Sequence, residues 1–465
     1  MPPSTRLRPR LAAADQRLLR QPGPAGDAER RSLLSGSRVA VISPGYEGKR
    51  FLYERAHELG VELVLLGEPD NWSRILVDEG IADRYLEMEL LGDPDLAAET
   101  IIQALGDEAA GIDGIVTFWE DAVPAAMRVA EILGLPGSPP AAADAARSKE
   151  RTLAASRAAG LPTAGYVRLS GASSLRAAAD QVGFPAVLKP SFGAEAHGVI
   201  RVDDLAGLEA AFGRVSLIVT PDFDPIFEQG TDLLLVEYLD GVEYDVDIVL
   251  SDGRCVFATV SENWPTDEPY FAETGLYSPA PCSPGNYAEL VRLTTQTAFA
   301  LGFRDAALHT EAKYTTQGGP RLLEVNARLA GGRIVQYHRM ITGVDLIEIV
   351  LLLAVGVPVA PVKNAEPACG VAAAFMHAPR SGILRGTGFL EHLAGDPAVF
   401  QADVTATAGE ALVAASDGFP SPLAEISVMG PDVPSAFGHL QRILEGLDIP
   451  IDATATAPAP EAASG

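Results

Sequence analysis

Two short stretches near residue 310 combine residue types that can hold a cation and an anion together. Residues 309–313 read His-Thr-Glu-Ala-Lys, and residues 321–328 read Arg-Leu-Leu-Glu-Val-Asn-Ala-Arg. If both stretches are β-strands, alternate side chains share a face. Glu311 then shares a face with its neighbours two residues away, and Glu324 shares one with Asn326. The spacing therefore predicts two carboxylates that can be brought to one site.

The seven residues between these stretches favour a chain reversal. Residues 314–320 read Tyr-Thr-Thr-Gln-Gly-Gly-Pro and end in a turn signal, which predicts an antiparallel hairpin. Such a hairpin gathers two carboxylates and an amide oxygen, and Mg²⁺ is usually held by one or two carboxylates plus substrate phosphates. The guanidinium of Arg328 can brace a transferred anion. A solvated polar hairpin face is the alternative, which the apolar Leu322, Leu323 and Val325 disfavour.

The composition is that of an ordinary globular protein. The chain has 465 residues, 47% of them hydrophobic and 21% charged, which is enough for roughly two to four domains. The net charge of -27 argues against nucleic acid and against anionic membrane lipid as partners. No run of about 18 apolar residues occurs, so we expect no membrane span. Three cysteines without C-x-x-C spacing favour a reduced, cytoplasmic protein.

Lysine is rare in this chain, and arginine supplies most of the positive charge. The five lysines are Lys49, Lys149, Lys189, Lys313 and Lys363. Their retention suggests positions that need a compact point charge.

Strand and helix patterns alternate in the first part of the chain. Apolar runs at residues 38–42, 61–67 and 114–118 read as buried strands, with helical patterns at residues 50–59 and 122–133. This alternation predicts a parallel sheet with both faces covered. The first turn is not a G-x-G-x-x-G sequence, which disfavours a dinucleotide site.

Further along, two segments lack regular periodicity and read as functional loops. Residues 191–198 contain two glycines between two predicted strands, and such a loop can bring backbone N–H groups close to phosphates. A plain hairpin turn is the alternative. Residues 261–285 are expected to form a long lid or substrate-binding loop. Residues 341–355 are predicted to form one long apolar core helix, and residues 434–447 another helix.

Several motifs occur in an order found in one superfamily. They are Arg-Ser-Lys at 147–149 with Gly-Leu-Pro-Thr at 160–163, Phe-Pro-Ala-Val-Leu-Lys-Pro at 184–190 with its glycine loop, Val-Glu-Tyr-Leu-Asp-Gly-Val-Glu-Tyr-Asp-Val at 236–246, His-Thr-Glu at 309–311, and Glu-Val-Asn-Ala-Arg at 324–328 with Gly331 and Gly332. In this order the chain resembles the ATP-grasp superfamily of carboxylate–amine ligases. The branch it resembles contains carnosine synthase and the bacterial L-amino acid ligases that make dipeptides.

The resemblance implies a role for each motif residue. The ATP-binding residues would be Lys149, Lys189, Ser191, Gly193, Gly198, Glu237, Tyr238, Leu239 and Glu243. Within this set the two lysines act on phosphates, residues 237–239 form the adenine hinge, and Glu243 holds the ribose hydroxyls. The ligands of Mg²⁺ (or Mn²⁺) would be Glu311, Glu324 and Asn326. The catalytic residues would be Arg328, facing the acyl phosphate, with Gly331 and Gly332, whose N–H groups lie near the oxyanion.

The implied fold is α/β and α+β, an ATP-grasp fold preceded by a Rossmann-like doubly wound domain. We expect a disordered leader (1–36), the Rossmann-like domain (37–140), a central ATP-grasp part with the glycine loop (141–235), a C-terminal ATP-grasp part with the metal site (236–360), an accessory subdomain (361–450) and a disordered tail (451–465).

The implied reaction converts a carboxylate, expected to be that of an amino acid, into an acyl phosphate and joins it to an amine. Both substrates are small molecules, and a homodimer is the default expectation. Glu273 and His309 are candidates for the base, and residues 119–121 and 261–285 for substrate selection. Glu195 departs from the superfamily pattern because it places a carboxylate near the phosphates.

Two alternatives stay open at this point. One is a superfamily member that activates bicarbonate as a carboxylase, although no biotin-attachment segment is present. The other is a non-catalytic protein that retains the nucleotide-binding fold.

Overall fold

The computed structural model describes residues 7–90, 92–194, 196–316 and 318–452. Residues 37–140 contain a four-stranded parallel sheet in the order β3-β2-β1-β4. Its strands are β1 (Arg38–Ile42), β2 (Glu62–Gly67), β3 (Arg84–Glu87) and β4 (Gly114–Val116). The main helices are α4 (Arg50–Glu58), α6 (Pro94–Leu105) and α7 (Val123–Leu133), with a short α5 (Ile75–Asp78). The predicted doubly wound arrangement is confirmed, and β3 is a strand that the sequence reading missed.

Alternation along β1 explains why helices cover both faces of this sheet. Val39 and Val41 pack into one core with Leu52 of α4, whereas Ala40 and Ile42 pack into a second core with α6 and α7. Successive side chains of a strand point to opposite faces, so a strand that is apolar at every position must be covered twice.

The expected disordered leader is wrong for residues 7–34. They form α1 (Leu7–Ala13), α2 (Gln16–Leu19) and α3 (Pro24–Leu34). Leu19 and Leu34 are fully buried in the same core as β1. Leucines at helical spacing gave these helices an apolar face, which the abundant Arg, Ala, Pro and Gly masked in the composition. Residues 1–6 lie outside the described residues.

The central part joins two helices to a small antiparallel sheet. The helices α8 (Pro140–Arg147) and α9 (Lys149–Ala158) precede a four-stranded sheet in the order β5-β8-β6-β7. Its strands are β5 (Tyr166–Arg168), β6 (Ala186–Pro190), β7 (Ile200–Val202) and β8 (Leu233–Glu237). The helices α10 (Leu175–Val182) and α11 (Leu205–Ile218) share a core with it.

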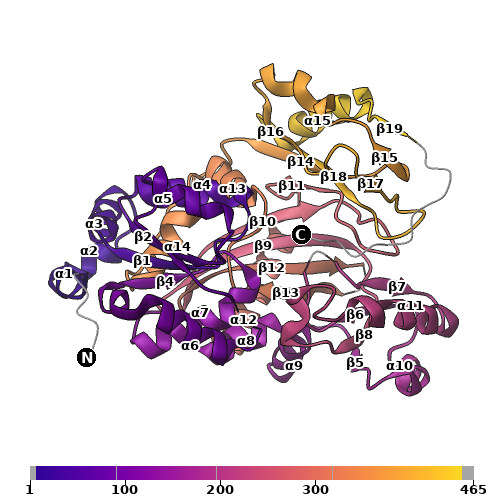
Figure 1. Cartoon of the computed structure of the whole chain (residues 1–465), viewed down its shortest axis with the longest axis horizontal. Coiled ribbons are helices and arrows are strands. Elements are labelled where there is room, and N and C mark those ends of the chain that lie inside the picture. Colours follow the sequence, from indigo (N-terminus) through magenta and orange to yellow (C-terminus); the bar gives the residue numbers. More distant parts are fainter. Residues whose placement is uncertain (1–6, 91, 195, 317, 453–465) are drawn as a thin grey trace.

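An eight-stranded sheet in the order β13-β12-β9-β10-β11-β14-β18-β16 forms the body of the molecule. Its strands are β9 (Val242–Ser251), β10 (Arg254–Asn263), β11 (Gly275–Ser278), β12 (Ala306–Thr315), β13 (Gly319–Asn326), β14 (Gly370–His377), β16 (Val399–Val404) and β18 (Pro422–Gly430). Helix α12 (Pro284–Leu301) packs on it. The strands of the accessory segment therefore continue the sheet that carries the hairpin (Figure 1).

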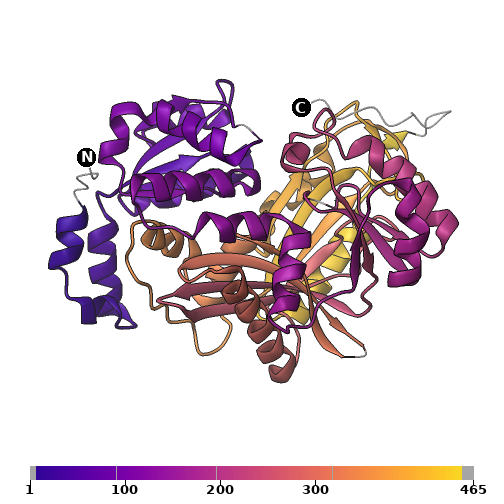
Figure 2. The same cartoon turned by 90° about the horizontal axis from the view of Figure 1, so that it is seen from below.

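The accessory segment also contains α15 (Val433–Gly446) and a small sheet of β15 (Gly382–Leu384), β17 (Ala411–Leu412) and β19 (Ile451–Asp452). The first two residues of the expected disordered tail thus form β19, and residues 453–465 lie outside the described residues. Both views place the N-terminal domain and the small central sheet at opposite ends of the molecule, with the large sheet between them (Figures 1 and 2).

Two expectations about single elements are corrected. Residues 341–355 do not form one helix, because α13 (Ile334–Thr342) ends at Gly343 (φ +76°) and Asp345 caps a new helix, α14 (Leu346–Ala354). Residues 261–285 are not one loop, because β10 runs to Asn263 and β11 pairs with it. Within the described ranges, no helix has the length and apolar character needed to cross a bilayer.

Candidate active site

The hairpin predicted around residue 310 is present, and its register brings the two carboxylates together. Strands β12 and β13 are antiparallel, with Glu311 opposite Glu324 and His309 opposite Asn326. A β-bulge follows Glu311. The hairpin forms one wall of a cleft whose other wall comes from the small sheet and the glycine loop. The predicted residues that line this cleft are Lys149, Lys189, Gly193, Glu237, Tyr238, Leu239, Glu243, Glu273, Glu311 and Glu324.

Two lysines and one carboxylate form the cationic end of the cleft. Lys149 Nζ lies 2.7 Å from Glu324 Oε2 and donates to the Gly193 carbonyl at 3.2 Å. Burial lowers the pKa of Lys189 to about 8, and the Lys149 ammonium adds to this effect. Burial acts to raise the pKa of Glu324, but Lys149, Lys189 and a hydrogen bond from Asn326 outweigh it and lower that pKa to about 2.

The carboxylates opposite the lysines outnumber them. Burial, followed by the charge of Glu324, raises the pKa of Glu311 well above its usual range. Partial loss of hydration in the cleft also raises the pKa of Glu273 to about 8, with the nearby Asp245 and Glu243 adding to the shift, although the residue as a whole is exposed. Carboxylates crowded in this way need positive charge to stay ionised together. The donor set therefore fits a divalent cation with a preference for oxygen ligands.

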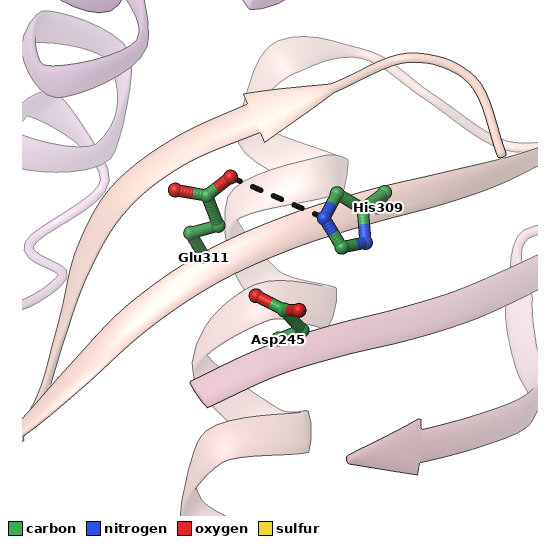
Figure 3. A group of neighbouring side chains, drawn as sticks. All are labelled: Asp245, His309 and Glu311. Atoms are coloured by element: carbon green, nitrogen blue, oxygen red, sulfur yellow. Dashed lines mark ion pairs between the residues drawn. The ribbon is translucent and has the colours of Figure 1, made fainter. Parts of the chain in front are cut away.

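Asp245, His309 and Glu311 converge on one point (Figure 3). Each offers a ligand atom, and these atoms lie within 4.8 Å of one another. Asp245 also accepts a hydrogen bond from Asn263 at 2.9 Å. The sequence reading missed Asp245, although it lies two residues after Glu243 on the same strand and so shares its face.

His309 belongs to a buried group of charged side chains that also contains Asp247 and His338. Its Nδ1 is 3.1 Å from Asp247 Oδ1, and His338 Nε2 is 2.7 Å from Asp247 Oδ2. Burial opposes protonation of His309, but Asp247 outweighs it and raises the histidine pKa to about 9. A protonated imidazole cannot accept a proton, so this environment disfavours His309 as the base.

The apolar end of the cleft lies at the predicted hinge. Tyr238 and Leu239 line it together with Val187, Leu322 and Phe271. The Tyr238 hydroxyl donates to Glu268 at 2.7 Å, and the Lys313 ammonium lies 5.7 Å from the Phe271 ring centroid. This end suits a flat aromatic group, because apolar side chains and a ring enclose it.

Comparison with known proteins identifies the family. A model described as ATP-grasp domain matches residues 182–336, and a model described as ATP-grasp N-terminal domain matches residues 53–137. The chain belongs to the ATP-grasp superfamily.

Two curated relatives of this ATP-grasp chain are named as a synthase and a ligase. Carnosine synthase 1 of Gallus gallus is 33% identical over 347 residues, which cover 72% of this chain and 37% of the relative. Alanine–anticapsin ligase of Bacillus subtilis is 27% identical over 269 residues, covering 54% of this chain and 56% of the relative. The chain thus spans less than two thirds of the length of either relative.

Solved structures share the ATP-grasp fold. An L-amino acid ligase from Bacillus licheniformis superposes with a TM-score of 0.75 at 21% identity, covering 90% of this chain and all of that one. The biotin carboxylase domain of the Hydrogenobacter thermophilus 2-oxoglutarate carboxylase, bound to MgADP and bicarbonate, gives 0.66 at 18% identity, covering 89% and 90%.

Three motif residues of the ATP-grasp chain, Ser191, Gly198 and Glu237, make structural contacts within the protein, and of these only Glu237 also lines the cleft. The Ser191 hydroxyl is buried 3.0 Å from that of Ser148, and its carbonyl accepts from the Lys149 N–H at 2.9 Å. Gly198 (φ +75°) closes the glycine loop, where an added Cβ would lie 3.1 Å from Val219. The Glu237 carboxylate accepts from the Gly165 N–H at 2.8 Å and pairs with Arg321 at 3.0 Å. Glu195 lies outside the described residues.

Arg328 connects the hairpin to the N-terminal domain. Its Nε lies 2.7 Å from Glu120 Oε2, in the turn that follows β4. Gly331 and Gly332 come next, and an added Cβ at either would meet nothing within 4 Å. Arg328 and these glycines follow the end of β13 and are not among the residues that line the cleft.

Proposed function

We propose that the protein is an ATP-dependent ligase that activates the carboxylate of an amino acid as an acyl phosphate and joins it to an amine. The products are an amide or dipeptide, ADP and phosphate. The observation that carries this proposal is a single cleft with an apolar end at residues 237–239 and a charged end where Lys149 and Lys189 face Glu311 and Glu324. The relatives named carnosine synthase and alanine–anticapsin ligase support amide formation.

Three groups of residues in the cleft bind the adenine, the ribose and the phosphates of the nucleotide. Residues 237–239 hold adenine, Glu243 holds the ribose, and the two lysines hold the phosphates. Glu311, Glu324 and Asn326 hold Mg²⁺ (or Mn²⁺), with Asp245 next to them. A metal ion held by these residues would neutralise phosphate charge, which is the main demand that phosphoryl transfer makes on a protein.

The proposed chemistry balances without an enzyme nucleophile. A substrate carboxylate oxygen attacks the γ-phosphorus of ATP, and the bond to the ADP oxygen breaks. An amine nitrogen then attacks the acyl carbon, loses a proton and displaces phosphate. Arg328 and the N–H groups of Gly331 and Gly332 stabilise the tetrahedral oxyanion. Glu273 is the candidate base, once positive charge in the cleft lowers its pKa.

The experiment is a pairwise screen of amino acids with ATP and Mg²⁺, read by mass spectrometry. We expect one pair to give a product lighter than its two parents by one water, together with one ADP and one phosphate per product. Phosphate release with bicarbonate alone would instead favour a carboxylase. Nucleotide binding with no turnover of any pair or of bicarbonate would favour a non-catalytic protein. The cytoplasmic location and the homodimer stay predictions from the sequence.

A further inference from the structure

The N-terminal sheet has a point where its strand order reverses, and charged side chains gather there. The order β3-β2-β1-β4 places β1 and β4 side by side, with the connections leading away from them in opposite directions. In open parallel sheets, ligands bind in the crevice outside the carboxyl ends of such a strand pair. Lys49 follows β1 at this edge, and Trp119 and Glu120 follow β4.

Lys49 is a buried cation in an aromatic surrounding. Its residue is 8% exposed, and its Nζ donates to the Phe118 carbonyl at 2.8 Å. The ammonium lies 5.6 Å from the Tyr46 ring centroid and 5.7 Å from that of Trp119. Gly45 (φ +73°) permits this packing, because an added Cβ would lie 3.0 Å from both the Lys49 stem and the Trp119 ring.

The charges at this edge of the sheet do not cancel. Glu120 is also 8% exposed, and Arg328 Nε already lies 2.7 Å from its carboxylate. In the described part of the chain, no carboxylate lies within 4.0 Å of Lys49 Nζ. Burial lowers the pKa of Lys49 to about 8, and the Arg328 charge adds to this effect. The cations Lys49 and Arg328 and the carboxylate Glu120 together carry one net positive charge, which an anionic ligand can neutralise.

This inference rests on the proposed ligase function. If both substrates are amino acids, one substrate carboxylate is activated and the other is not, and the Lys49 position suits the second. The carboxylate to be activated must lie at the charged end of the cleft, near Lys149 and Lys189. Lys49 belongs to the N-terminal domain, near Glu120 and Arg328, and is not among the residues that line the cleft. An amine substrate that is itself an amino acid brings a second carboxylate, which is not activated and needs a counter-ion elsewhere.

We propose that the crevice between β1 and β4 binds the carboxylate that the amine substrate keeps, with the Lys49 ammonium as its counter-ion and Tyr46 and Trp119 as the walls. Lys49 is thereby a specificity-determining residue that selects amino acids over simple amines. Arg328 links this crevice to the reacting centre, because its partner Glu120 belongs to the same turn as Trp119.

The test is calorimetric binding of the standard amino acids and their α-carboxamides, each in the presence of Mg²⁺ and a non-hydrolysable ATP analogue. We expect the wild-type protein to bind at least one amino acid about tenfold or more tightly than its amide. Lys49→Met and Lys49→Gln should reduce this preference to less than about twofold, and Lys49→Arg should keep most of it. The affinity for the ATP analogue should stay unchanged in all three variants.

Lys363→Met is the matched control, because Lys363 Nζ also faces a carbonyl, at 3.4 Å, and a single ring, at 5.3 Å, but on an exposed surface. It should not change the preference. A merely structural Lys49 would weaken acid and amide equally. Retention of the full preference in Lys49→Gln, or no preference in the wild type, would overturn the inference. Amino acid binding without any amide product would contradict the ligase function and leave this carboxylate site standing.

Discussion

The Lys149 ammonium lies 2.7 Å from a carboxylate oxygen of Glu324, so a proposed phosphate-binding group and a proposed metal-binding group neutralise each other directly. A nucleotide entering with its cation must exchange this pair for two new ones, between Lys149 and a phosphate and between Glu324 and the metal. The two binding events are therefore linked through one contact.

Replacing Lys149 by Met should change the two affinities in opposite directions. The affinity for ATP should fall about tenfold or more, since a charge-assisted contact to a phosphate is lost. The affinity for Mn²⁺ without nucleotide should rise, because Glu324 no longer has an ammonium partner. Calorimetry with each ligand measures both, with Lys363→Met as the control. A parallel fall of both affinities would show that the pair has no such role.

The stability of the metal-free protein should fall as pH rises from about 5 to 8. The folded-state pKa of Glu273 is about 8, so the folded protein keeps a proton that the unfolded chain releases near pH 4.5. The folded state thus binds more protons in this window, and its stability decreases with pH. Urea unfolding measures this decrease, which solvent screening keeps well below the full value of the pKa shift because Glu273 is exposed. Glu273→Gln should remove the part of this pH dependence that Glu273 contributes, while the raised pKa values of Glu311 and His309 keep the rest. A slope unchanged in that variant contradicts the assignment.

Asp247 should be a major contributor to stability. It is 3% exposed and pairs with His309 and His338, so Asp247→Asn leaves buried histidines without their counter-charge and should cost about 3–5 kcal/mol. The raised pKa of His309, about 9, gives stability that is complete below about pH 6.5 and disappears as pH rises through 9. The difference between wild type and variant should shrink over that window. Asp203→Asn, whose side chain is 69% exposed, is the control and should change stability by less than about 0.5 kcal/mol.

Helices α1 to α3 should unfold together with the N-terminal domain rather than independently of it. Leu34 is fully buried against the first parallel sheet, and Leu34→Ala should destabilise the protein by about 2–5 kcal/mol. Leu217→Ala removes the same atoms at a position that is 77% exposed and should change stability little. Thermal unfolding of both variants makes the comparison. Equal melting temperatures for the two would mean that residues 7–34 do not contribute to the core.

The elements that the sequence predicted correctly are those whose structure follows from a local residue pattern. The hairpin at residues 306–326 followed from alternation and a Gly-Gly-Pro turn, and the parallel sheet followed from apolar strands alternating with helices. The start of helix α14 was predicted at residue 341, before its observed start at Leu346, because apolar residues occur on both sides of the break at Gly343 and only the Asp345 cap marks the new start.

Long-range pairing was the part that sequence could not supply. Nothing in the residues around Glu120 or Arg328 indicates that the two side chains meet across 208 positions. The predicted group of carboxylates around Glu311 could have been extended to β9, since Glu243, Asp245 and Asp247 occupy every second position of that strand. Only the register of β9 against β12 shows that Asp247 faces His309 and that Asp245 faces Glu311.

The eight-stranded sheet runs without interruption into the accessory segment, so the chain cannot be truncated near residue 360 without exposing a strand edge. Strand β11 has β10 on one side and β14 on the other, and β14 belongs to the segment after residue 360. Cutting the chain there would leave β11 with a row of unpaired N–H and C=O groups, the kind of edge that recruits strands from other molecules. A shortened version ending near residue 360 should therefore self-associate, even though every residue of the nucleotide cleft is retained in it.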